Sequence, residues 1–132
     1  MAIRKPTRVY KDIDLSLKKN PNTKDVSKKV DVPAVKQALK ILVNTQFTEK
    51  PFQPLFGSQV RGLLFEPMSH STSSLLASVI ELAIQNFEPR VRVEDVTVIA
   101  NHDQNSYDVV ISFFVRGIRD LQELGLVLER LR

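Results

Sequence analysis

The sequence predicts an α+β domain in which helices precede a small antiparallel sheet. Apolar residues recur with a helical period between residues 32 and 88, and they alternate with polar residues after Pro89. The chain has 132 residues, of which 42% are hydrophobic, and this is enough for one core. We therefore expect a single domain over residues 31–132, preceded by an arm of residues 1–30.

The first helix is predicted over residues 32–46. Asp31 is a suitable N-cap, and Pro33 is tolerated in a first helical turn. The apolar residues that follow have helical spacing: Val35, Ala38, Leu39, Leu42 and Val43. One face of this helix should therefore be buried.

Residues 47–57 are predicted to form a loop, because Pro51, Pro54 and Gly57 prevent a regular element. We expect its phenylalanines to anchor it on the core. A short helix over residues 61–65 should follow and end near Pro67.

A second long helix is predicted after residues 70–73, whose hydroxyl groups are suitable caps. Its buried face contains Leu76, Val79, Ile80, Ala83 and Phe87. It should end at or before Glu88, because a residue that precedes proline avoids the helical conformation.

Alternation of period two predicts the strands. Residues 91–100 alternate, but the phase slips at Glu94 and Asp95, which indicates either a bulge or a strand that starts only near Val96. Residues 101–106 are rich in turn formers and should connect a hairpin. Residues 107–116 then form the clearest strand, and Gly117 ends it.

The C-terminal segment fits two patterns. An amphipathic helix would be lined by Ile118, Leu121, Leu124, Leu128 and Leu131, whereas Leu124, Leu126 and Leu128 alternate as in a strand. Gly125 disfavours a helix interior, but this local pattern leaves both structures open.

Charge is distributed unevenly along the chain. Residues 1–30 hold nine basic and three acidic side chains, whereas the rest holds ten basic and twelve acidic ones. Such an arm suits a phosphate backbone or an acidic protein surface, or it is a solvated leader. Nucleic acid is not the expected partner, because Tyr10 is the only ring available for stacking.

Several classes of function lack support. No apolar run is long enough to cross a bilayer, the start of the chain lacks the apolar core of a secretory signal, and there are no cysteines. We therefore expect no membrane span and folding in a reducing cytoplasm. His70 and His102 lack ligand spacing, and the four glycines form no nucleotide-binding motif. No metal, cofactor or catalytic residue is predicted.

The Glu88-Pro89-Arg90 segment stands where the second helix meets the sheet. Proline fixes the backbone between two opposite charges, which could face a partner or form an intramolecular pair. An exposed pair stabilises by only about 0 to 1 kcal/mol, so stability alone is a weak reason for the arrangement.

Three short motifs resemble one known family. They are Tyr10-Lys11-Asp12-Ile13-Asp14, the segment from Phe52 to Gly57 followed by Leu63-Leu64-Phe65-Glu66, and Asn86-Phe87-Glu88-Pro89-Arg90. In this order they resemble the baseplate wedge subunits of contractile-tailed phages and of type VI secretion systems. The resemblance extends from about Tyr10 to the C-terminus.

The resemblance implies a structural protein of the virion tail, assembled in the host cytoplasm and present in several copies around the tail tube. Glu88, Pro89 and Arg90 would contact the helical core bundle of the wedge. It also favours a final strand at about residues 121–130, which gives a sheet of about three strands. Through that strand, with Leu124, Leu126 and Leu128, the protein would seed the tail sheath. Tube or hub proteins are further candidate partners.

The residues are compatible with this role, because an open sheet edge can accept a strand from another chain. The strand at residues 107–116 is apolar on both faces, which requires either a partner or the loop at residues 52–56 as cover. The alternative function is a peptidoglycan hydrolase, which some members' lysozyme-like label suggests. Its candidate carboxylates, by elimination only, are Glu66, Glu81, Glu88 and Asp103, and their spacing marks no catalytic pair. We therefore expect no enzyme.

Overall fold

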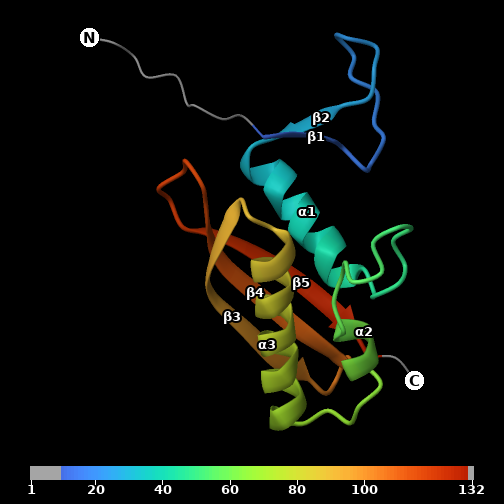
Figure 1. The fold of residues 1–132 in the computed structure, drawn as a ribbon, viewed down its shortest axis with the longest axis vertical. Helices are drawn as coiled ribbons and strands as arrows, with labels where there is room; N and C mark the ends of the chain where they lie inside the picture. Colours follow the sequence, from blue (N-terminus) through green and yellow to red (C-terminus); the bar gives the residue numbers. More distant parts are fainter. Residues whose placement is uncertain (1–9, 131–132) are drawn as a thin grey trace.

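The structure of the chain is a computed structural model that describes residues 10–130. Helices α1 and α3 lie on one face of a three-stranded sheet, and two further short strands lie near the start of α1 (Figure 1). The elements are β1 (Lys11–Ile13), β2 (Lys28–Val30), α1 (Val32–Asn44), α2 (Val60–Leu63), α3 (His70–Phe87), β3 (Val91–Asn101), β4 (Ser106–Val115) and β5 (Gln122–Glu129). The predicted α+β class is confirmed.

Strand β4 lies at the centre of the larger sheet and pairs antiparallel with β3 and β5. The β3 register shifts between Val93 and Asp95, so the phase slip in the sequence is a bulge within one continuous strand. The ambiguous C-terminal segment is a strand, as the resemblance favoured.

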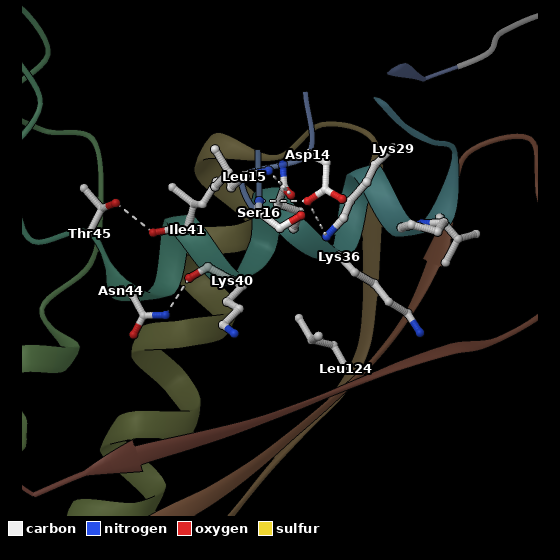
Figure 2. Close-up of a pocket in the computed structure, with 13 residues that line it drawn as sticks. Asp14, Leu15, Ser16, Lys29, Lys36, Lys40, Ile41, Asn44, Thr45 and Leu124 are labelled. Carbon is white, nitrogen blue, oxygen red and sulfur yellow. Dashed lines mark hydrogen bonds and ion pairs between the residues drawn. The ribbon is translucent and has the colours of Figure 1, made fainter. Parts of the chain in front are cut away.

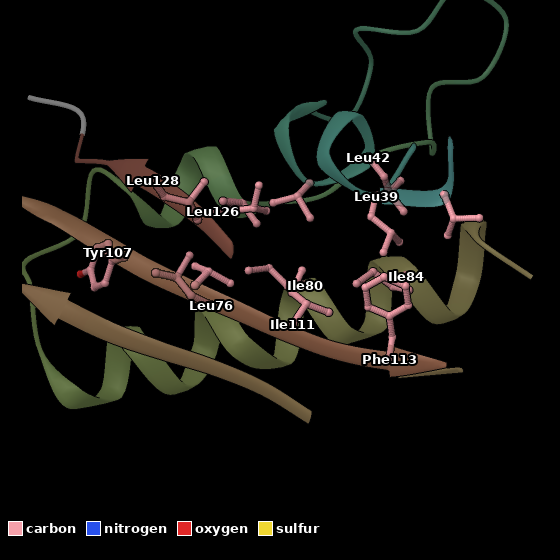
Figure 3. Packing of buried hydrophobic residues seen from close by; sticks show 14 of the residues in the cluster. Leu39, Leu42, Leu76, Ile80, Ile84, Tyr107, Ile111, Phe113, Leu126 and Leu128 are labelled. Carbon is pink, nitrogen blue, oxygen red and sulfur yellow. The ribbon is translucent and has the colours of Figure 1, made fainter. Parts of the chain in front are cut away.

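Alternation along β4 builds the core. Every second side chain, from Tyr107 to Val115, points toward the helices and is fully buried or nearly so. Figure 3 shows these side chains packed against α1, α3 and β5. The labelled partners are Leu39, Leu42, Leu76, Ile80, Ile84, Leu126 and Leu128. Full burial of one such side chain contributes roughly 1.5 to 3 kcal/mol, so this layer dominates the stability of the fold.

The helix caps differ from the prediction. Asp31 makes no side-chain cap; its φ is 56°, and its carboxylate instead accepts a hydrogen bond of 3.1 Å from the Tyr10 amide. Helix α3 is capped by Ser69, one residue before the predicted stretch, whose hydroxyl accepts a bond of 3.1 Å from the Thr72 amide. The prediction placed the cap of α3 too late, because the apolar pattern begins several residues after the first helical residue, His70, which the cap must precede.

The loop before α2 is only partly anchored by its phenylalanines. Phe52 is fully exposed, which contradicts the prediction, whereas Phe56 packs edge-on against Phe87 with ring centres 5.2 Å apart. Gly57 closes the base of the loop at a φ of 123°. A Cβ atom there would lie 2.6 Å from the Thr45 carbonyl oxygen, so the position requires glycine.

The N-terminal segment is more ordered than an extended arm. Strands β1 and β2 pair antiparallel around the predicted loop, and we call residues 10–30 the N-terminal hairpin. The Gln37 side chain on α1 donates to the Ile13 carbonyl at 2.8 Å and accepts from the Leu15 amide at 3.3 Å. We expected the ordered domain to begin at Asp31, but these bonds show that ordered structure begins before that residue. Residues 1–9 lie outside the described part.

Candidate functional site

The end of α3 forms a rigid charged corner at Glu88, Pro89 and Arg90. Arg90 donates from Nε to Oε1 of Glu88 at 2.6 Å and from Nη2 to Oε2 at 2.8 Å. The helix ends at Phe87, because Pro89 prevents it from continuing. The side chains of Glu88 and Arg90, on either side of the proline, therefore meet. The bidentate arrangement is the strong form of an ion pair.

Burial decides which part of the corner faces outward. Glu88 is only 8% exposed, whereas Pro89 is exposed and Arg90 is half-buried. The Glu88 carboxylate, by hydrogen bonding, raises the pKa of the Arg90 guanidinium against the opposing effect of burial. The surface therefore presents Pro89 and the outer side of a fixed guanidinium, with Glu88 behind them.

Tyr10 supports the corner from the N-terminal hairpin. The Arg90 guanidinium carbon lies 5.4 Å from the centre of the Tyr10 ring, within the range of a cation–π contact. The Asp31 amide donates to the Tyr10 carbonyl at 2.6 Å, and the Tyr10 amide donates to the Asp31 carboxylate, so the backbone that carries the ring is held in place. The one sequence signal for this contact is that Tyr10 is the only aromatic residue among residues 1–30, and nothing local connects it with Arg90.

The second candidate surface is the free edge of β5. The Arg130 amide bonds to the Asn105 carbonyl at 3.0 Å, which fixes the phase of hydrogen bonding along β4 and β5. Because this phase alternates, the backbone groups of Glu123, Gly125 and Val127 point away from β4. No backbone hydrogen bond within the described part of the chain reaches them, and all three residues are exposed. They form an open template for another strand.

The three leucines predicted for this surface alternate with these residues, and their backbone groups point toward β4. Leu126 and Leu128 are buried in the core, and Leu124 is half-buried facing α1. Their backbone groups bond to β4, so contact with an added strand falls to the backbone of the residues between them. Strict alternation with leucine inward was the signal that could have identified those residues.

The candidate carboxylates of a hydrolase have different surroundings. Glu66 lies exposed after α2, Glu81 accepts a bond from Gln85 on α3, and both oxygens of Glu88 are held by Arg90. His70 opens α3 and His102 lies in the turn between β3 and β4, and both side chains are exposed. Among residues 10–130, no cluster of three or more histidine or acidic residues could hold a metal ion, and no helix is long and apolar enough to cross a membrane.

Comparison with known proteins gives a consistent relationship. A relative in Enterobacteria phage T4, named baseplate wedge protein gp25, is 35% identical over 108 residues, which cover 82% of this chain and 81% of the relative. A structure described as a tail lysozyme from Geobacter sulfurreducens shares the fold at a TM-score of 0.70 and 19% identity, covering 76% of this chain and 91% of that one. A chain of the anti-feeding prophage baseplate matches at a TM-score of 0.63 and 20% identity, with coverage of 94% and 88%.

The family described as baseplate wedge protein gp25 matches residues 30–120, which include both long helices, the corner and β4. This segment exceeds half of the chain, and the identity to the phage relative extends over most of both sequences. The chain therefore belongs to the baseplate wedge protein gp25 family.

Proposed function

We propose that this protein is a structural subunit of a contractile-tail baseplate, which docks on the wedge core bundle and starts the sheath. The name of the phage relative and the baseplate structure that shares the fold support the baseplate role. The single observation that carries the finer proposal is the pairing of a rigid charged corner with an open strand edge in one small domain.

Docking is assigned to the corner. A partner carboxylate or carbonyl group can bind the outer side of the Arg90 guanidinium while Glu88 keeps that side chain in one orientation. Little side-chain entropy is then lost on binding, which favours affinity. Pro89 adds a fixed apolar contact beside it.

Sheath initiation is assigned to β5. Its pairing with β4 runs without a register shift, whereas β3 at the opposite edge is interrupted by a bulge and carries Arg92, Glu94 and Asp95. Bulges and charges protect a sheet edge from pairing with other chains. A sheath subunit would therefore add its strand beside β5.

These assignments make other wedge proteins and the sheath subunit the principal partners, with tube or hub proteins as further neighbours. The protein would act in several copies around the tail tube in the virion, after assembly in the bacterial cytoplasm. Neither membrane nor nucleic acid binding belongs to this role. We also propose no catalysis, since Arg90 occupies both oxygens of the most buried candidate carboxylate.

The docking role is tested by the double variant Glu88→Ala with Arg90→Ala. Removing both partners leaves no unpaired buried charge, so we expect a folded protein. Its incorporation into baseplates, measured by immunoblot of purified particles, should fall below detection, while circular dichroism keeps the spectrum of the natural chain.

The matched control is Glu81→Ala with Gln85→Ala, which removes an exposed bonded pair from the same helix. This variant should enter baseplates normally. Normal incorporation of the folded Glu88→Ala, Arg90→Ala protein would contradict docking at the corner.

A further inference from the structure

A groove of about 720 Å³ lies between α1, the N-terminal hairpin and β5. Figure 2 shows Leu124 facing α1 across this space, with Lys36 and Lys40 extending from the helix. Most of the lining residues are polar or charged, but apolar atoms, among them those of Leu15 and Ile41, form most of its surface. Leu15 is 59% exposed and Ile41 39%, so the groove has an apolar surface that nothing in the described chain covers.

The groove reaches β5 at Leu124, the one residue of that strand in its lining. A second hollow of about 210 Å³ lies at the other end of that strand, against Leu128 and Glu129. Asn44 at the end of α1 lines both hollows, and Arg61 of α2 lines the second. Each hollow therefore touches β5, one at Leu124 and the other at residues 127–129. The outward backbone groups of this strand have no partner among the described residues.

The helix side of this space is basic. Lys36 and Lys40 stand one turn apart on α1, and neither forms a salt bridge with any residue of the described chain. Lys29 also lines the groove and is paired with Asp14 at 3.7 Å. An occupant that brings carboxylates toward α1 would therefore meet two cations that have no other charged partner in this part of the chain.

We propose that the groove accepts an extended segment of a partner protein whose α1-facing side chains are apolar and acidic. This inference rests on the proposed strand addition at β5 and adds the chemistry of the strand that is recognised. The apolar side chains would contact Leu15, Ile41 and Leu124, and the carboxylates would pair with Lys36 and Lys40.

The charges and side chains of the groove favour this occupant over two others. Residues 1–9 of the chain carry Arg4, Lys5 and Arg8 and no acidic side chain, so they would be repelled by the same lysines. A nucleic acid would need stacking surfaces, but none of the groove-lining residues is aromatic, and Asp14 places a carboxylate there.

The test uses the full chain and two peptides, one repeating Val-Thr-Glu-Thr and one repeating Val-Thr-Lys-Thr, with binding followed by fluorescence anisotropy. We expect the glutamate peptide to bind more tightly and to slow hydrogen exchange at the amides of Gly125 and Val127. The variant Lys36→Glu with Lys40→Glu should bind it at least about tenfold more weakly and should prefer the lysine peptide. Lys40→Glu alone, at an exposed position, gives the same direction should the double variant fail to fold.

The matched control is Lys24→Glu with Lys28→Glu, which changes the net charge equally at exposed positions outside the groove. It should bind the glutamate peptide as the natural chain does. Equal binding of the two peptides, equal weakening by the control variant, or displacement of the peptide by oligothymidylate would overturn the inference. Since this assay uses the purified chain, such a failure leaves baseplate incorporation, which the corner variant measures, as a separate question.

Discussion

At the scale of single residues, a polar group buried in the core affects the stability of the fold and its dependence on pH. The Tyr107 hydroxyl is buried and has no hydrogen-bond partner among the described residues, although its ring is fully packed. Burial raises the pKa of this phenol above its ordinary value of 10.0, and the charge of Arg130 opposes the shift. The neutral form is therefore the one that the folded state favours.

Tyr107→Phe is expected to keep or raise the free energy of unfolding by about 1 kcal/mol at neutral pH, because it removes a buried group that lacks a partner. The sign of the pH effect follows from the raised pKa. The stability of the natural chain should fall as the pH rises above 10.0, where the unfolded tyrosine ionises first. Urea unfolding measured on both sides of that pH should show a smaller fall for the variant.

A comparison with Ile111→Ala calibrates this measurement, since that variant opens a cavity on the same buried face of β4 and should lose about 2 to 5 kcal/mol. A loss above about 1 kcal/mol for Tyr107→Phe would show that the hydroxyl has a bonding partner.

At the scale of elements, periodicity predicted most of the fold because each long element buries one face. Helix α3 and strand β4 show their periods clearly. The bounds of β4 differ from the prediction by one residue, whereas α3 begins at His70, within the stretch that was predicted to cap it. The β1 and β2 pair was missed, because three-residue strands with exposed side chains carry no apolar alternation. The C-terminal strand could not be separated from a helix locally, because only pairing with β4 distinguishes the two patterns.

The site was predicted less completely than the fold, for a physical reason. Side-chain patterns identify which residues face the core, and they named the three leucines of β5. Backbone groups at a sheet edge have no side-chain signature, and their direction depends on the hydrogen-bond phase set by Asn105 and Arg130. In contrast, the Glu88 and Arg90 pair was visible in the sequence, because a proline between two charges restricts them locally.

The edge of β5 provides a test at this scale. Val127→Pro removes an outward N–H group and leaves the bonds to β4 in place, as proline is tolerated on edge strands. The free energy of unfolding should change by about 1 kcal/mol or less. Baseplates that contain the variant should fail to extend a sheath in electron micrographs. Val127→Ala, which keeps the N–H group, should give sheathed tails, and sheathed tails with Val127→Pro would contradict strand addition at β5.

At the scale of the whole molecule, the core and the N-terminal hairpin are separable in their packing. The buried cluster is formed by residues from α1 to β5, and Tyr10 is the one hairpin residue of the described chain that packs against it. The hairpin is attached mainly through hydrogen bonds to Gln37 and Asp31 and through the contact of the Tyr10 ring with the Arg90 guanidinium. We therefore propose that residues 31–132 are a domain that folds without the preceding segment.

A chain that starts at Asp31 should keep the circular dichroism of helix and sheet and unfold cooperatively in urea. Two hydrogen bonds to Gln37 are lost, each contributing about 0.5 to 1.5 kcal/mol, so the free energy of unfolding should fall by roughly 1 to 3 kcal/mol. Gln37→Ala in the full chain removes the same bonds while the hairpin remains, and it should reproduce much of this loss. A shortened chain that binds a hydrophobic dye and unfolds without cooperativity would show instead that the hairpin is part of the folding unit, and the boundary at Asp31 would then be wrong.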